Sequence, residues 1–505
     1  MKQILLKKIQ KYFLLLTIIA LPFMNLPKRF TFSFIGFNAV YYILLISLVF
    51  FVYEYYKYKT QFNKTIFYFF LIFVFFQIIS LFHGLIIYPY YDSIDISQLT
   101  KLKYLNDKFN ISLENNIIIA VWLLFREIKN IILSSFCFCF IPLLFIHLFS
   151  NDEKRVVPFI EEAVLFLVCL FCLYSIPEVL YLKFDNQIAK HILETINPFL
   201  YDVVSAHGWW PPILWDKNGG QLRSLCQEPS FFCVIAAFCI PFLVNYIYKN
   251  FSLKNILLFT FFIFMLFMSK SRTGMVLFLI EIIMIFSLFL YDFNKKKLCF
   301  ILTLLFCIFF SAFININIPN KINKQKEQET FKNYIDNNLM STIKLDSRSN
   351  KARLSNAIAM TKVGLSNPVL GVGKGLKDVY IVENIPEFAK KDKETNIWIT
   401  KFKEKGFKST FPVLNHYAYV FAENGIIGLI IFILPILYVF YMICKNKFLL
   451  RNFDFMIMII AFIGQLFSML GQTYFMTYPV SLGLVFLYIN GITNKKNESI
   501  NNVKH

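Results

Sequence analysis

The stretch KKKLCFILTLLFCIFFSAFIN, residues 295–315, contains the pattern that decides the fold of this chain. Three lysines at its start are followed by an apolar run long enough for one helical crossing of a bilayer, which needs about 20 residues. Lysine and arginine are enriched in short cytoplasmic loops, so the lysines mark the cytoplasmic end. The stretch therefore predicts a membrane-spanning helix whose far end, near Asn315, lies outside the cytoplasm.

Similar apolar runs recur along the chain and predict an all-α polytopic membrane protein with about 12 transmembrane helices. The runs do not alternate at every second residue, which argues against an outer-membrane β-barrel. The first run lacks an Ala-x-Ala cleavage site, so we interpret it as a span rather than a signal peptide. The runs lie near residues 12–27, 34–55, 66–88, 130–149, 161–182, 229–248, 254–269, 273–291, 297–315, 424–444, 453–471 and 473–491.

The composition agrees with this interpretation. Of the 505 residues, 57% are apolar and only 16% are charged, whereas an ordinary soluble domain has about 25% charged residues. These values exclude a disordered chain, a collagen-like fibre and a disulfide-stapled secreted module. The formal net charge of +20 is explained by basic loops that orient the spans, so it does not indicate a nucleic-acid partner.

The distribution of basic residues predicts the topology. Lysine or arginine occupies every short connection on the side of the N-terminus, which puts both termini in the cytoplasm. Two segments on the opposite side, 89–129 and 183–228, are too long for simple turns, and a third is a loop of about a hundred residues whose length usually indicates function. The predicted parts are 1–315 with spans one to nine, the large extracytoplasmic loop 316–423, 424–491 with the last three spans, and a cytoplasmic tail, 492–505.

Polar side chains at the outer membrane edge are the functional candidates, because charges near a bilayer are costly and usually functional. Glu228 precedes the span that starts at Pro229, where it is either a helix cap or a general base, and the nearby Arg223 is a candidate phosphate ligand. Lys270 and Arg272 stand in the turn between spans seven and eight. The planar donor fork of Arg272 suits a phosphate, and contact with lipid headgroups is the structural alternative.

Two more clusters lie in or after the long loop. Arg353 is followed by Asn367-Pro368-Val-Leu-Gly371-Val-Gly373-Lys374-Gly375, whose glycines allow either an anion-binding nest of amides or an ordinary turn. Asn415 and His416 precede a predicted span, and His416 is a candidate for proton transfer or pyrophosphate binding. No metal-binding or nucleotide-binding motif accompanies these clusters, so the sequence predicts neither a metal nor a cofactor.

Two further features allow two interpretations each. Trp209, Trp210 and Trp215 lie in the segment 183–228, where they either mark the headgroup level or stack on sugars. Glu281 is an isolated acid within the eighth span. It belongs either to a proton path or to a polar contact inside the bundle.

In their order along the chain, these motifs resemble the O-antigen polymerase/O-antigen ligase superfamily of bacterial polysaccharide assembly. The many spans and the large late loop are similar as well. The resemblance implies a multi-pass protein of the bacterial inner membrane that handles glycans linked to undecaprenyl pyrophosphate, without a metal. The motifs are Glu228-Pro229-Ser230, Ser271-Arg272-Thr273-Gly274, Asn367-Pro368-x-Leu370-Gly371-x-Gly373, and Asn415-His416 ahead of Glu423-x-Gly425-x-x-Gly428.

The resemblance also implies a glycosyltransferase mechanism. Arg272, with Arg353 and Arg223, would bind the donor pyrophosphate and stabilise its charge as it leaves. Glu228 or His416 would take the proton of an acceptor hydroxyl. The implied partners are a lipid-linked donor and acceptor, the bilayer, a chain-length regulator and a flippase, and they include no nucleic acid. Further substrate-binding candidates are Lys270, Lys374 and Asn415.

Two positions favour a polymerase over a ligase. Ligases resembling this family carry His-Asn, then nine residues, then Gly-x-x-Gly. When Gly425-x-x-Gly428 is aligned with these glycines, Asn415 takes the asparagine position but Leu414 takes that of the histidine. Arg353 stands eleven residues before Gly364, a spacing similar to that of polymerases. We therefore expect a surface-polysaccharide polymerase.

Three alternatives stay open at this stage. The alternatives to the polymerase are an O-antigen ligase, which transfers glycan to lipid A–core, and a protein O-oligosaccharyltransferase. The third is a lipid-linked oligosaccharide flippase, which is a transporter and not an enzyme. A flippase would be expected to have pseudo-repeated halves and short loops. In this chain the longest predicted loop instead separates nine spans from three.

Overall fold

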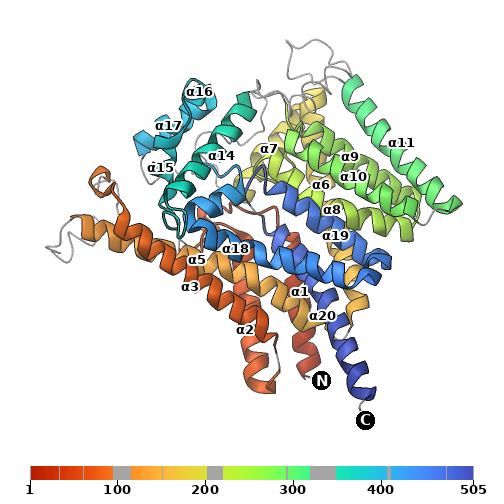
Figure 1. Ribbon diagram of the computed structural model, residues 1–505. Coiled ribbons are helices and arrows are strands. Elements are labelled where there is room, and N and C mark those ends of the chain that lie inside the picture. The colour runs from red at the N-terminus through yellow and green to blue at the C-terminus, as the bar shows by residue number, and fades with distance from the viewer. Residues whose placement is uncertain are drawn as a thin grey trace.

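The computed structural model describes residues 2–32, 34–60, 62–94, 115–150, 152–201, 220–291, 294–318, 348–405, 411–473 and 475–503. Within these residues the chain forms helices, turns and irregular connections, and no strand. Figure 1 shows long helices packed against one another. Both termini lie together at one edge of the molecule, and the shorter helices of residues 348–405 lie at another.

Each of the twelve predicted spans corresponds to a helix (Figure 1). In chain order these helices are α1 (Lys2–Ile19), α2 (Ala39–Tyr58), α3 (Lys64–Ile87), α5 (Asn115–Phe149), α6 (Val156–Phe184), α8 (Pro229–Lys249), α9 (Leu253–Met268), α10 (Arg272–Tyr291), α11 (Lys295–Asn317), α18 (His416–Lys445), α19 (Phe453–Ser468) and α20 (Thr477–Val503).

Eight of these helices are long and apolar enough to cross a membrane: α2, α3, α5, α6, α8, α10, α11 and α18. Two more, α9 and α19, are apolar but shorter. The prediction of an all-α polytopic membrane protein is therefore confirmed. The remaining described helices are α7 (Gln187–Leu200), α14 (Arg348–Ser366), α15 (Lys377–Asn384), α16 (Glu387–Lys390), α17 (Lys393–Lys405) and the short 3-10 turns η1 (Lys28–Phe30), η2 (Tyr91–Ser93), η4 (Glu153–Arg155) and η8 (Lys447–Arg451).

Helix α8 lies in the interior of the bundle. Of its most apolar stretch, 83% is buried, compared with 22% for α3, and it packs against α6, α10 and α19. Gly274 of α10 allows close approach, because a Cβ atom at this position would lie 2.3 Å from Sγ of Cys233. In lipid, helices associate mainly through such packing, since the solvent around them is itself apolar.

Side-chain caps explain where many of these helices begin. The first backbone N–H groups of a helix have no partner within it, and an Asn or Ser oxygen just before the helix can accept one of them. The sequence contains such a residue before six of the twelve helices that correspond to predicted spans. The capping residues are Asn38, Asn63, Ser252, Asn294, Asn415 and Asn452.

Several helix boundaries differ from the predicted ones. Helix α1 covers Lys2–Ile19, whereas the predicted span runs from residue 12 to 27. Helix α18 begins at His416 rather than near residue 424, and it is broken at Gly425, whose φ is 63°. Helix α5 has 35 residues and is about 52 Å long, so it exceeds a hydrocarbon core of about 30 Å. The last two helices are joined by residues 469–476 and not by a turn at Gly471 and Gln472 alone.

The helices α14 to α17 form a small unit on α18. Helix α14 packs along α18 and also against α15 and α17. A separate apolar core holds the unit together, because its side chains are removed from water. This core contains Ala359, Met360, Val363, Val372, Ile381, Ile385, Ala389, Phe411 and Ala422.

Candidate functional site

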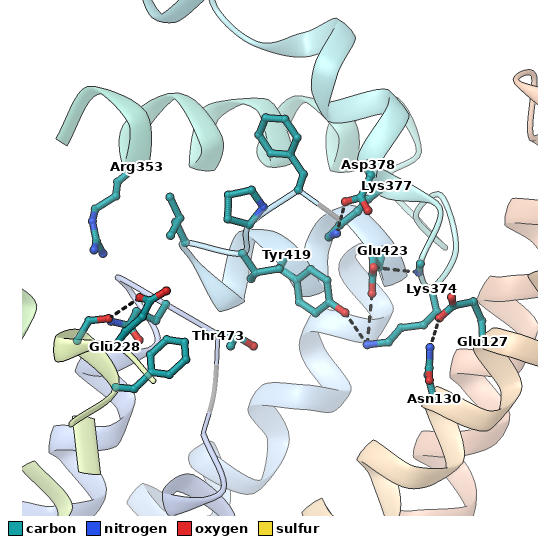
Figure 2. A pocket seen from close by; sticks show the side chains of 18 of the residues that line it. Glu127, Asn130, Glu228, Arg353, Lys374, Lys377, Asp378, Tyr419, Glu423 and Thr473 are labelled. Carbon is teal, nitrogen blue, oxygen red and sulfur yellow. Dashed lines mark hydrogen bonds and ion pairs between the residues drawn. The ribbon is translucent and has the colours of Figure 1, made fainter. Parts of the chain in front are cut away.

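A cavity of about 490 Å³ lies between α14–α15, α18, the start of α8, the first part of α5 and the 469–476 connection. Its polar side chains gather at two ends, with Tyr419 and Thr473 between them (Figure 2). We call one end, formed by Glu228, Ser230 and Arg353, the arginine end. The opposite end, which we call the carboxylate end, is formed by Arg126, Glu127, Asn130, Lys374, Lys377, Asp378 and Glu423.

Glu228 stands at the N-cap position of α8, but its side chain makes no capping hydrogen bond. Its backbone carbonyl accepts from the N–H groups of Phe231 and Phe232, while its carboxylate accepts from Oγ of Ser230 at 3.1 Å. Burial raises the pKa of this carboxyl, and the Ser230 hydrogen bond and the charge of Arg353 oppose the shift. Glu228 is therefore a carboxylate of increased basicity that faces the cavity.

Arg353 projects from α14 into the arginine end, where Nη1 donates to the carbonyl of Gly471 at 2.6 Å. Burial lowers the pKa of its guanidinium, the charge of Arg272 acts in the same direction, and Glu394 and Glu228 oppose the shift. Arg272, the first residue of α10, is thus near Arg353 without lining the cavity itself. Two guanidinium groups this close suit a ligand with more than one negative charge.

The carboxylate end is an array of charged pairs. Nζ of Lys374 donates to the hydroxyl of Tyr419 at 2.6 Å and lies 3.4 Å from Oε2 of Glu423. Asn130 donates to Oε2 of Glu127 at 3.0 Å. The second residue of α15, Asp378, accepts from Lys377.

Burial alone would lower the pKa of Lys377, but the carboxylates of Asp378 and Glu423 outweigh it and raise the pKa. Lys377 therefore keeps its positive charge although it is buried. The described residues contain no group of three His, Cys, Asp or Glu side chains spaced to hold a metal ion.

The glycine-containing segment of residues 367–375, which we call the glycine motif, packs against the break in α18 at Gly425. The N–H groups of Gly371, Val372 and Gly373 donate to the carbonyls of Asn367, Ala422 and Glu423. The N–H of Gly375 donates to Oε1 of Glu423 at 3.0 Å. These amides already have protein partners, so the loop is a structural turn here and the anion-nest interpretation is not supported.

Gly375 and Gly425 explain why this motif needs glycine. At Gly375, with φ of +76°, a Cβ atom would lie 2.3 Å from Cδ of Glu127. At Gly425, with φ of +63°, it would lie 2.3 Å from the carbonyl oxygen of Val369. Both positions combine a left-handed backbone with close contact, which residues other than glycine rarely tolerate.

His416 lies in a second cavity, of about 280 Å³, which shares Lys374, Tyr419 and Thr473 with the first. Nδ1 of His416 is 3.3 Å from Oγ1 of Thr473, and its ring packs 5.0 Å from that of Phe432. His416 therefore does not share a cavity with Arg353.

Asn415 serves as the cap of α18. Its side-chain oxygen accepts from the N–H of Ala418 at 3.0 Å, and its amide donates to the carbonyl of Leu470 at 3.4 Å. Asn415 lines neither of the two cavities. Its local hydrogen bonds account for its presence in the motif.

Arg223 and Lys270 also lie apart from both cavities. The buried guanidinium of Arg223 lies 4.8 Å from the centroid of the Tyr201 ring, while its main-chain N–H donates to Glu178. Lys270 has φ of 49° in the turn between α9 and α10. Trp209, Trp210 and Trp215, and most of the loop before residue 348, lie outside the described residues.

Sequence reasoning missed Arg126, Lys377 and Asp378 as parts of the site, and also Glu127 and Asn130. Both follow Arg126 in the stretch VWLLFREIKNIIL, residues 121–133, where charged and amide side chains interrupt an otherwise apolar helix. Residues three apart on a helix lie on the same face. This spacing indicates a polar face on the helix. It does not show that the glycine motif and α18 lie against that face.

Residues 257–433 match a protein-family model described as O-Antigen ligase. The matched segment runs from α9 into α18 and includes Arg272, Arg353, Lys374 and Glu423. No curated protein and no solved structure matches the chain significantly. The family match confirms the resemblance to the O-antigen ligase/polymerase superfamily.

Proposed function

Because the chain carries a domain of the O-antigen ligase family, we propose that it is a surface-polysaccharide polymerase. It transfers an undecaprenyl-pyrophosphate-linked glycan onto another lipid-linked repeat unit at the outer face of the bacterial inner membrane. The observation that carries this proposal is that Glu228, a carboxylate not used as a helix cap, shares one cavity with the buried Arg353. A base and a phosphate-binding group that border the same space are the minimum for glycosyl transfer.

The reaction forms one bond and breaks one. A hydroxyl oxygen of the acceptor sugar attacks the anomeric carbon of the donor, and Glu228 accepts the hydroxyl proton. The bond between that carbon and the pyrophosphate oxygen breaks, and undecaprenyl pyrophosphate leaves with the bonding electrons. Burial raises the pKa of Glu228, so Glu228 is a stronger base than an ordinary carboxylate.

Arg353 and Arg272 stabilise the leaving group. Negative charge grows on the pyrophosphate as the glycosidic bond breaks, and guanidinium donors at a partly desolvated site interact strongly with it. Arg353 makes no salt bridge within the described chain, so its charge is not neutralised by a bonded carboxylate. Arg272 acts beside it from the start of α10.

Glu228 is favoured over His416 as the base. His416 borders the smaller, largely aromatic and apolar cavity and not the one that contains Arg353. A base has to be within hydrogen-bond reach of the attacking hydroxyl, directly or through one water. Glu228 meets this requirement if the pyrophosphate is held by Arg353.

The Arg353–Gly364 spacing supports the polymerase assignment and has a structural basis. Eleven residues are about three helical turns, so both residues lie on the same face of α14. Gly364 lets α14 sit on α18, since a Cβ atom there would lie 2.4 Å from the Phe421 ring. Arg353, on the same face of α14, lines the cavity. Leu414, which occupies the position of the ligase histidine, also lines the cavity, but its side chain cannot transfer a proton.

A ligase is the second candidate, favoured by the description of the matched family. The two functions differ in the surface glycan of a strain that lacks the gene. For a polymerase, gel electrophoresis should show glycan limited to one repeat unit. Loss of all glycan attachment would contradict the polymerase and support the ligase.

A further inference from the structure

We propose that the carboxylate end of the cavity binds the acceptor as an uncharged, hydroxyl-rich sugar, and that it is not a second phosphate site. This inference rests on the proposed glycosyl transfer and names the substrate part that occupies the other end of the same cavity. Its residues come from α5, the glycine motif, α15 and α18. They are Arg126, Glu127, Asn130, Lys374, Lys377, Asp378 and Glu423.

The first argument is the pairing of charges. Each of the three cations at this end has a carboxylate partner: Glu127 lies 3.0 Å from Arg126, Glu423 lies 3.4 Å from Lys374, and Asp378 lies 2.5 Å from Lys377. A pyrophosphate placed here would meet as many carboxylates as cations. The cations of the carboxylate end are therefore all held in direct ion pairs, whereas Arg353 hydrogen-bonds a carbonyl and the carboxylates of Glu394 and Glu228 act on it only through their charge.

The second argument is that two carboxylate oxygens, although each belongs to an ion pair, accept no hydrogen bond. Oε1 of Glu127 and Oε2 of Glu423 are buried and make no hydrogen bond within the described residues. Their side chains are only 3% and 1% exposed, and each oxygen is close to a cation without hydrogen-bond geometry. A buried acceptor without a donor is costly, and sugar hydroxyls are donors that would satisfy both oxygens.

The third argument is rigidity. Glu127 rests against Gly375, where there is no side chain to displace it, and Asn130 holds its other oxygen at 3.0 Å. Glu423 is fixed by the N–H of Gly375 at 3.0 Å. Binding groups held by other contacts lose little conformational entropy on binding. The two carboxylates are therefore already in position for a ligand.

The arrangement gives each substrate part its own end. With the donor pyrophosphate at Arg353, an acceptor sugar held by Glu127 and Glu423 extends past Tyr419 and Thr473 towards Glu228 (Figure 2). The cavity volume of about 490 Å³ falls within the usual range of ligand sites, about 300–1,000 Å³.

The test separates the two ends with two probes. The first probe is the repeat-unit oligosaccharide released from the cell's own lipid-linked pool by mild acid, which removes the pyrophosphate. The second is inorganic pyrophosphate. Binding of each is measured by calorimetry with purified full-length protein in nanodiscs, for wild type, Glu127→Gln, Asn130→Ala and Arg353→Ala. Glu387→Gln, an exposed Glu→Gln change on α16, is the matched control.

We expect Glu127→Gln to weaken oligosaccharide binding about tenfold or more, the effect of losing a hydrogen bond to a charged group. Asn130→Ala should weaken it less, and Glu387→Gln should leave it unchanged. Arg353→Ala should instead weaken only pyrophosphate binding. If Glu127→Gln and Asn130→Ala both bind the sugar like wild type, or if Glu127→Gln lowers only pyrophosphate affinity, the proposal is overturned.

This outcome is independent of the polymerase assignment. A gene-deletion strain with an unchanged glycan ladder would contradict the polymerase but leave the two-probe pattern intact. Unchanged sugar binding in both α5 variants would remove the acceptor subsite but leave the deletion phenotype intact.

Discussion

Glu228 and Asn415 both occupy the N-cap position of a long helix, yet only Asn415 uses its side chain as a cap. The carboxylate of Glu228 instead faces a cavity with Arg353. An N-cap oxygen that does not cap leaves a backbone N–H without its usual side-chain partner. This difference separates a structural residue from a candidate base at two positions that look alike in the sequence.

The pH dependence of transfer should reveal Glu228. A base works only when deprotonated, so activity should be present above the pKa of Glu228 and fall as the pH drops through it. Burial raises that pKa, so the loss should occur above the ordinary glutamate value of about 4.3. The measurement is the initial rate of glycan transfer against pH.

Glu228→Gln provides the comparison for this profile. The variant should lower the rate about 10²–10⁴-fold and abolish the acidic limb of the remaining activity. A wild-type rate that stays constant down to pH 4, or a variant with the wild-type profile, would contradict the role of Glu228.

At the scale of elements, the break in α18 holds the site together. Gly425 turns the helix, and the glycine motif binds the exposed backbone through the N–H of Gly373 to Glu423 and of Ile426 to Pro368. Ser80 of α3 also donates to the carbonyls of Leu370 and Glu423, at 2.7 and 2.8 Å. The break therefore connects α3, the glycine motif and α18, which are far apart in the sequence.

Gly425→Ala should disrupt this junction. Its φ of 63° is unfavourable for alanine, and the new methyl group would meet the Val369 carbonyl, so we expect a loss of about 1–3 kcal/mol from backbone strain alone. Thermal unfolding in detergent measures the effect. Ile430→Ala, a half-exposed position on the same helix, is the control, and equal melting temperatures of the two variants would refute the structural role of Gly425.

The spans could be predicted because an apolar run of bilayer length has few alternatives to a helix. The sequence also indicated Glu228, Arg353 and Lys374, since charges near a membrane are rare. It could not indicate that α5 extends back to Asn115, because Arg126 and Glu127 lower the hydropathy there. The contact of Glu127 with Gly375 joins residues far apart in the chain, and no local pattern encodes it.

At the scale of the whole molecule, the account requires the cavity to face the extracytoplasmic side. The helices α14 and α15 border the cavity, and both termini lie together at another edge of the molecule (Figure 1). The basic connections predict that the termini are cytoplasmic. The orientation is therefore a prediction from the charge distribution, and it can be measured directly.

Thiol labelling tests this orientation. In a background with Cys299 and Cys444 replaced by serine, since these two are exposed, a membrane-impermeant maleimide should label Glu387→Cys in intact spheroplasts. Lys8→Cys, near the N-terminus, should react only after lysis. The parent without an added cysteine should stay unlabelled. Labelling in the reverse pattern would contradict the topology.

The most direct test of the central claim is glycan transfer by the purified protein in nanodiscs, with only lipid-linked repeat units as substrate. We predict that glycans of two or more repeat units form and that one undecaprenyl pyrophosphate is released for each new linkage. Glu228→Gln should lower both signals about 10²–10⁴-fold and Arg353→Ala should lower them strongly as well, while Glu387→Gln should retain them. A wild-type protein that forms no linkage, or variants that elongate like wild type, would contradict the account.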